Sequence, residues 1–338
     1  MNKKPDLYFN YGARGEFDLD IVKCDADGNP IPGTVRRVVT ACPNLITNNG
    51  LSLLNAGGRA GASNVDGTIA NFMNSCGVGT GNATPAFTDT ALTRVAVRST
   101  TTSTDPVWFA GSPTDTVYYT RTYTFPVGAA TGNLTEIGLY VNNQANVANS
   151  LLTTRALILV GGIPGTVTVL ADEQLIVTYR LYVTALLVDS TLTTTQKGVS
   201  YTLTLRMSNM GLAIPFNNTG LFGYPIAPVM NAGSGQSGVE AYYGATVTLG
   251  APTVGVTATS STATSQSAPI VYGWSYLTVN TYRDDVITIG LTSLNLVDIG
   301  AWRFSGNPFF VKVGVLPKLT KTNLDVMKFT IRTTVTRA

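Results

Sequence analysis

Apolar and polar residues alternate with a period of two along residues 175–184, and this pattern limits the fold more than any other feature. Leucine, valine and tyrosine stand at the odd positions, whereas threonine and arginine are confined to the even ones. Residues 327–336 show the same alternation near the C-terminus. Successive side chains of a β-strand point to opposite faces, so each segment predicts a long strand with one face on a core.

The composition extends this prediction to the whole chain. The 338 residues are 44% hydrophobic but only 12% charged, against about 25% charged in an ordinary soluble protein. Abundant threonine, valine, asparagine and glycine, with little lysine or glutamate, favours strands joined by tight turns over helices. We therefore predict an all-β protein. The one predicted helix is short, at residues 47–55, with Thr47 or an asparagine as its N-cap.

Two turns between strands can be placed from polar residues. The alternating segment 17–22 runs into the polar segment 25–30, and an extended pattern resumes at 35–40. The segment 196–198 separates residues 186–188 from the predicted strand 199–205. Both patterns are typical of β-hairpins.

The two alternating strands also suggest an internal duplication. Aligning them matches Thr178 with Thr330 and Arg180 with Arg332. Upstream, segments 135–140 and 156–161 resemble segments 297–302 and 309–314 in the same order. We predict two tandem antiparallel β-sandwich or jelly-roll-like domains, residues 1–205 and 206–338. The alternative is two unrelated sheets that share strand chemistry.

Charge is almost absent from residues 207–282, where Glu240 is the only charged residue. A surface that faces water alone carries far more charge. We therefore predict that this segment contributes a contact surface in a homo-oligomer. Within it, the threonine- and serine-rich residues 257–267 are expected to form a mobile loop or an arm laid on a neighbouring copy.

Several function classes are excluded or disfavoured by the composition. The chain has no histidine, so it contains no Ser-His-Asp triad, no Cys-His pair and no imidazole metal ligand. Its 22 basic and 19 acidic residues form no basic stripe of the kind that nucleic-acid binding requires. The apolar runs are too short to span a bilayer, and no apolar segment follows Lys3 and Lys4 as in a signal peptide. We expect no nucleic-acid partner and no membrane insertion.

Three cysteines, Cys24, Cys42 and Cys76, are an odd number without CxxC spacing. We expect them to stay free thiols in a reducing cytosol.

Motifs that resemble catalytic or ligand sites have simpler structural interpretations. The glycine-rich segment 77–82 lacks the lysine of a phosphate loop and is followed by Pro85, which favours a structural turn. The segment 25–29 resembles a calcium loop, but Arg36 stands where the bidentate glutamate is needed. Glu136 and Asp298 occupy equivalent positions of the proposed duplication, so we expect structural acceptors rather than a catalytic pair. We predict no enzyme activity, no cofactor and no metal.

Aromatic residues supply the candidate site. On a surface poor in charge they suit either a protein–protein interface or the apolar face of a sugar ring. The candidates are Trp108, Phe109, Tyr242, Tyr243, Trp274 and Tyr276.

A set of short motifs resembles virion structural proteins of tailed bacteriophages, of the tail, tail-fibre or collar type. The resemblance covers roughly residues 45–205. It rests on segments 45–51, 77–85, 89–92, 135–139, 155–158 and 169–179. It implies a structural component of a virion, assembled in the host bacterial cytoplasm. Its partners would be identical copies, in a trimer or ring, and neighbouring virion proteins. The alternatives are a capsid decoration protein and a carbohydrate-binding module that recognises a host surface glycan.

Overall fold

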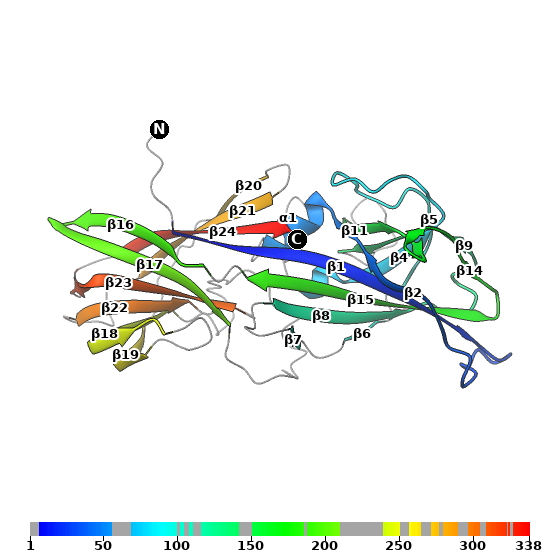
Figure 1. Cartoon of the computed structure of the whole chain (residues 1–338), viewed down its shortest axis with the longest axis horizontal. Coiled ribbons are helices and arrows are strands. Elements are labelled where there is room, and N and C mark those ends of the chain that lie inside the picture. Colours follow the sequence, from blue (N-terminus) through cyan, green and yellow to red (C-terminus); the bar gives the residue numbers. More distant parts are fainter. Residues whose placement is uncertain are drawn as a thin grey trace.

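The computed structural model of the chain shows an elongated molecule built almost entirely of β-strands (Figure 1). The all-β prediction is therefore confirmed. The structure describes residues 7–55, 69–99, 102–104, 108–110, 116–141, 151–185, 188–209, 239–250, 257–264, 272–276, 280–289, 297–304, 309–322, 324 and 327–338.

A nine-stranded sheet runs along the molecule, with β1 (Leu7–Lys23) near its centre (Figure 1). On one side of β1 lie strands from the C-terminal part of the chain, and on the other side strands from the N-terminal part. The order is β20 (Tyr272–Tyr276), β21 (Asn280–Ile289), β24 (Met327–Arg337), β1, β15 (Glu173–Ala185), β8 (Thr116–Thr124) and β6 (Thr102–Thr104). In addition, β2 (Arg36–Pro43) pairs with β1, and β7 (Trp108–Ala110) pairs with β8.

The alternating segments form the strands that the sequence predicts. In β15, every odd-numbered residue is buried and every even-numbered residue is half-buried. The second segment forms β24, in which Ile331 and Val335 are buried. The buried face of both strands belongs to one continuous hydrophobic core. The expected hairpin near the N-terminus is also present, since β1 pairs with β2.

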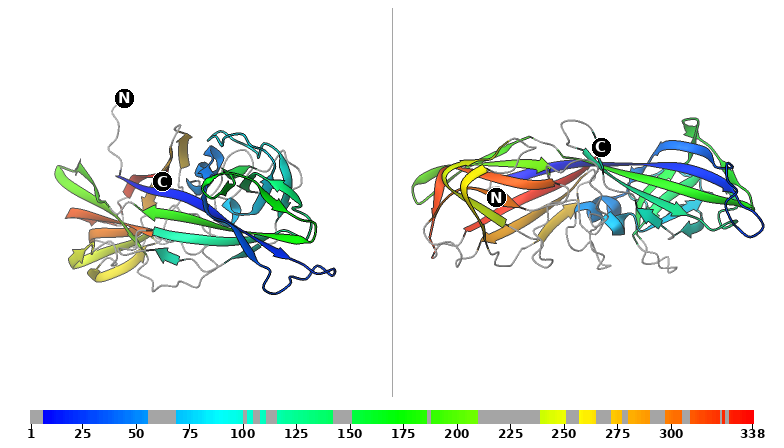
Figure 2. Two further views of the ribbon diagram at one scale, coloured as in Figure 1. Left: turned by 45° about the vertical axis from the view of Figure 1, so that its right-hand side comes forward. Right: turned by 90° about the horizontal axis from the view of Figure 1, so that it is seen from below.

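Two further sheets lie at opposite ends of the molecule (Figures 1 and 2). The five-stranded sheet has the order β3 (Leu45–Ile46), β11 (Leu152–Leu157), β10 (Glu136–Tyr140), β4 (Ser75–Gly79) and β5 (Val95–Ser99). The six-stranded sheet has the order β16 (Ser190–Gln196), β17 (Val199–Asn209), β23 (Phe309–Lys321), β22 (Val297–Phe304), β18 (Val239–Thr248) and β19 (Thr257–Thr264). Two small ladders pair β12 (Leu159–Val160) with β13 (Ile163–Pro164), and β14 (Val167–Val169) with β9 (Gly132–Leu134).

The two halves of the chain repeat one strand order. The series β3-β11-β10-β4-β5 corresponds to β17-β23-β22-β18-β19, because each series places its strands in the same relation to chain order. In the nine-stranded sheet, β6-β8-β15 likewise corresponds to β20-β21-β24, whereas β1 pairs antiparallel with β15 and parallel with β24. Three matching segments and a matching topology support the internal duplication predicted from the sequence.

The boundary predicted between residues 205 and 206 does not match the sheets. It falls inside the continuous strand β17. Furthermore, β1 pairs in parallel with β24 from Leu7 to Ala13, and antiparallel with β15 from Tyr11 to Lys23. The first strand of the chain therefore takes part in both halves. Pairing between the two ends of a chain leaves no local signal, and this is why the sequence did not reveal it.

The described part of the chain contains two short helices, which lie between the strands. The predicted helix is α1 (Asn48–Asn55), and Thr47 caps it because the Thr47 hydroxyl accepts a hydrogen bond of 3.1 Å from the amide of Gly50. The second is α2 (Ile69–Phe72). Within the described ranges, neither helix has the length or the apolar character needed to cross a membrane.

One expectation about the charge-poor segment is wrong. Residues 257–264 form the strand β19, paired with β18, rather than a loop or a free arm. Threonine favours extended backbone, and the ordered partner strand overrides the low complexity of the segment.

The shared strand predicts that both halves unfold together. We expect Phe17→Ala in β1 to lower the free energy of unfolding by about 3–5 kcal/mol, because Phe17 is fully buried. Urea unfolding followed by the fluorescence of the buried Trp302, in a Trp108→Phe/Trp274→Phe background, should shift to lower urea. Tyr8→Ala is the control, since Tyr8 is 51% exposed on the same strand. An unchanged Trp302 transition would show that the halves are independent.

Candidate functional site

The six candidate aromatic residues lie in three different strands. Tyr242 in β18 is only 8% exposed and Tyr243 packs against the hydrophobic core, so both contribute to the interior of the chain. The backbone of β7 places Trp108 opposite Tyr118, and Phe109 opposite Val117. Trp274 and Tyr276 lie in β20. The side chains of Trp108, Phe109, Trp274 and Tyr276 lie outside the described part of the structure.

An aromatic cluster crosses the nine-stranded sheet beside Trp108. The register aligns Arg14 of β1, Tyr182 of β15 and Tyr118 of β8 in one row, which we call the aromatic row. The rings of Tyr118 and Tyr182 are 5.5 Å apart between centroids, and the Arg14 guanidinium lies 3.8 Å from the centre of the Tyr182 ring. These contacts are typical aromatic and cation–π geometry. The sequence did not single out Tyr182, because it occurs alone in an alternating strand.

Charged side chains next to the aromatic row pair with one another. The Tyr182 hydroxyl donates a hydrogen bond of 2.8 Å to Glu16. Arg180 forms ion pairs with Glu16 at 3.4 Å and Asp18 at 2.8 Å, and Arg37 lies 2.9 Å from Asp18. Burial, together with the hydrogen bond to Glu16, raises the pKa of Tyr182 to about 12, so its hydroxyl remains a donor at neutral pH.

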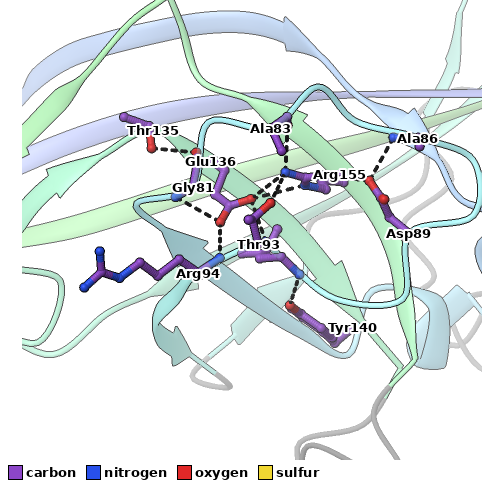
Figure 3. Close-up of polar contacts among 11 residues, drawn as sticks. Gly81, Ala83, Ala86, Asp89, Thr93, Arg94, Thr135, Glu136, Tyr140 and Arg155 are labelled. Atoms are coloured by element: carbon purple, nitrogen blue, oxygen red, sulfur yellow. Dashed lines mark hydrogen bonds and ion pairs between the residues drawn. The ribbon is translucent and has the colours of Figure 1, made fainter.

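A second polar cluster is buried around Glu136 at the start of β10 (Figure 3). Its carboxylate is 0% exposed. It accepts hydrogen bonds from the backbone amides of Gly81 at 3.1 Å, Thr93 at 3.0 Å and Arg94 at 2.7 Å. A Cβ atom at Gly81 would collide with this carboxylate. Gly77 and Gly79 lie in the buried strand β4, so the expected turn is wrong for residues 77–79, and only residues 80–82 belong to a loop that folds around a side chain of its own protein.

Arg155 of β11 supplies the positive charge of this cluster. Its guanidinium lies 2.9 Å from Glu136 and 2.7 Å from Asp89, and it also donates to the Ala83 carbonyl at 2.8 Å (Figure 3). Because these partners come from the loop between β4 and β5 and from β10, Arg155 fixes that loop onto the five-stranded sheet. Asp298 instead accepts from Thr320 in the six-stranded sheet. The two carboxylates therefore do not form a catalytic pair.

Four charged residues of the six-stranded sheet lie in one cross-strand row. The registers align Glu240 of β18 with Arg303 of β22, Arg303 with Lys312 of β23, and Lys312 with Arg206 of β17. Arg206 is at the end of the row and forms an ion pair with Asp189, the residue directly before β16. The single charged residue of the charge-poor segment thus has arginine as its cross-strand neighbour.

Lys312 is the buried member of this row. It is 0% exposed, and its ammonium donates a hydrogen bond to the carbonyl of Leu249. Burial lowers the pKa of Lys312 to about 8, and the neighbouring positive charge of Arg206 acts in the same direction.

No arrangement for holding a metal is found in the part of the chain that the structure describes, where histidine, cysteine, aspartate and glutamate form no group of three or more. A cavity of about 440 Å³ opens beside Arg155, between Pro43, Phe87 and Arg337. The guanidinium of Arg337 already stacks on Phe87 at 4.0 Å and donates to the Ile46 carbonyl. Both arginines at the cavity are therefore engaged within the chain.

A scan of protein-family models, a search of curated proteins and a search of solved structures each gave no match to this chain. The chemistry of the surfaces and of the edge strands therefore provides the basis for a functional proposal.

The Glu136 cluster predicts a large difference between buried and exposed arginines. We expect Arg155→Met to lower the free energy of unfolding by about 3–5 kcal/mol, because it leaves a buried carboxylate without its counter-charge. Arg14→Met, which removes a half-exposed arginine 3.5 Å from Glu16, should cost about 0–1 kcal/mol. Urea unfolding of both variants tests this. Equal losses would contradict the role of Arg155 as the partner of Glu136.

Lys312 predicts a rise of stability with pH. Its pKa is about 8 in the folded chain and 10.5 ordinarily, so between these values the unfolded chain binds the proton and the folded chain does not. Lys312 should therefore contribute an increase in the free energy of unfolding as pH rises from 8 to 10.5, whereas burial raises the pKa of the Cys42 and Cys76 thiols and gives the opposite contribution. Urea unfolding at several pH values should show a smaller rise in Lys312→Met than in the wild-type chain. The control Lys318→Met, on the same strand, should keep the full rise; identical slopes for all three proteins would refute the prediction.

Proposed function

We propose that the chain is a structural component of a tailed bacteriophage particle, in the tail, neck or collar, or anchoring a fibre, which assembles through protein–protein interfaces. The observation that carries this proposal is the chemistry of the six-stranded sheet at its two edges. The edge strands are β16, with the sequence STLTTTQ, and β19, with the sequence TATSSTAT. Neither contains a charged residue or a proline.

Uncharged edge strands favour assembly with other subunits over a monomeric state. A strand at the edge of a sheet offers free N–H and C=O groups to any other strand, and monomeric proteins protect such edges with lysine, proline or bulges. In a particle, neighbouring copies cover these edges. Burial against other subunits thus explains two edge strands that a monomer would have to protect.

The pairing of charges within the chain supports the same proposal. Glu16, Asp18, Arg37 and Arg180 form ion pairs with one another, and Arg155 pairs with Glu136 and Asp89. The exposed residues of the β16 edge include Thr191, Thr193 and Thr195, and threonine can be buried against a partner at lower cost than an unpaired charge. Identical copies and neighbouring virion proteins are the partners that this surface suits.

Two alternatives use the same features differently. A capsid decoration protein would also assemble through uncharged edges. A host-adhesion module is favoured by the aromatic row, because neighbouring tyrosine rings beside Arg14 and Glu16 offer both apolar surface and hydrogen-bonding groups to a sugar ring.

The experiment is quantitative mass spectrometry of purified particles, combined with labelling of the protein in electron micrographs. We expect a fixed number of copies, located on the tail, collar or fibre base. Copies spread over the capsid would favour decoration instead. Absence from the particle would refute a virion role, and host-polysaccharide binding that is lost on Trp108→Ala would favour adhesion.

A further inference from the structure

We infer that β16 binds β16 of a second copy of the chain, antiparallel and across a two-fold axis at Thr193, so that two six-stranded sheets join into one. This inference deepens the proposed assembly function, on which it rests. It follows from the backbone of the β16–β17 hairpin, the exposure of its side chains, and the charges at the two ends of the strand.

The hairpin determines which backbone groups of β16 face outward. Gln196 pairs with Val199 across the two-residue turn Lys197–Gly198, whose φ angles are both positive, 50° and 79°. Such a type I′ turn is closed by a pair that exchanges both of its hydrogen bonds, and the alternate residues then direct N–H and C=O away from the partner strand. The outward set in β16 is Thr191, Thr193 and Thr195.

The side chains of this outward set are accessible. Thr191, Thr193 and Thr195 are all exposed, whereas Leu192 is half-buried and packs against the hydrophobic core. Among the described strands, β16 pairs with β17 on one side and ends the sheet on the other. The edge therefore presents three identical residues at a spacing of two, in a strand already anchored on its inner face.

This edge is self-complementary about Thr193. In an antiparallel pair centred there, Thr193 faces Thr193 of the second copy, and Thr191 faces its Thr195. All of these are residues with outward backbone groups, so each pair exchanges two hydrogen bonds. Cross-strand threonine pairs add a favourable side-chain contact.

The charges flanking the strand select a second copy as the occupant. The same register places Asp189, which precedes β16, opposite Lys197 of the second copy, which follows β16. Opposite charges therefore meet at both ends of the pair. The hydrogen bond from Arg206 lowers the pKa of Asp189, which keeps its carboxylate ionised. A parallel pairing would instead bring Asp189 to Asp189 and Lys197 to Lys197, so like charges would repel.

The contact is expected to be reversible in isolation. One strand edge buries much less than the roughly 1,200–2,000 Å² of a stable protein–protein interface. Within a particle, other contacts hold the copies together and raise the effective concentration of this edge. A two-fold contact of this kind is compatible with a ring interface elsewhere on the chain.

Cysteine cross-linking tests both the pairing and its register. In the proposed dimer the two Thr193 Cα atoms lie about 5.5 Å apart, so Thr193→Cys should yield a covalent dimer on oxidation or with a short bismaleimide. Thr202→Cys is the matched control, because Thr202 is exposed and lies opposite Thr193 on β17, one strand away from the edge. The native cysteines are buried, so the wild-type chain should form no covalent dimer in the same assay.

The register is tested by two further variants. Thr191→Cys alone should not cross-link, because the two copies of residue 191 would be about 14 Å apart. An equal mixture of Thr191→Cys and Thr195→Cys should cross-link as heterodimers. Thr193→Cys yields no greater than those of Thr202→Cys would overturn the inference, as would efficient cross-linking of Thr191→Cys alone. Virion localisation without this cross-link would leave the proposed function intact, whereas the cross-link in a protein absent from particles would refute only that function.

Discussion

The pairing of β1 with both β15 and β24 is the interaction on which the rest of the fold depends. Two halves with the same strand order could each close their own sheet and remain connected only by a linker. Instead, one seventeen-residue strand lies between β15 and β24 and forms hydrogen bonds to each. The nine-stranded sheet therefore continues from one half to the other, and the outer sheets pack at its two ends (Figures 1 and 2).

The chain can fold with few charged residues because several of them form ion pairs with one another. Arg155 neutralises Glu136 within the five-stranded sheet, and Arg206 pairs with Asp189 beside the six-stranded sheet. These arginines pair with carboxylates, whereas the buried Lys312 donates to the backbone carbonyl of Leu249. These charged residues thus lie where they have partners within the chain. The edge strands β16 and β19 are uncharged and consist mainly of threonine and serine.

Local features of the fold could be predicted from the sequence, whereas long-range ones could not. The alternation at 175–184, the cap at Thr47 and the turn at Lys197–Gly198 are properties of neighbouring residues, and the structure has each of them. The shared strand β1 and the boundary inside β17 depend on residues hundreds of positions apart. The prediction of a loop or arm at residues 257–264 is wrong because composition alone does not reveal that β18 is available to pair with this segment.

The candidate site likewise has a part that could be predicted from neighbouring residues and a part that depends on long-range contacts. Adjacent aromatic residues can be identified as candidates from the sequence, but Tyr242 and Tyr243 contribute to the interior of the chain. Tyr182 and Arg14 come together only because β1 and β15 are paired. Glu136 was recognised as an acceptor at the start of a strand, but its three amide donors and Arg155 are brought to it by the fold.

The parallel pairing of β1 with β24 has a consequence for the order of events during synthesis. β1 lies far before β24 in the chain, so it is synthesised long before the strand with which it pairs in parallel. Until β24 has been made, Leu7–Ala13 of β1 lacks this native neighbour, although β2 and β15 are already present. An early edge of this kind is exposed to foreign strands. Synthesis of β24 is therefore also the step that lets the centre of the nine-stranded sheet close.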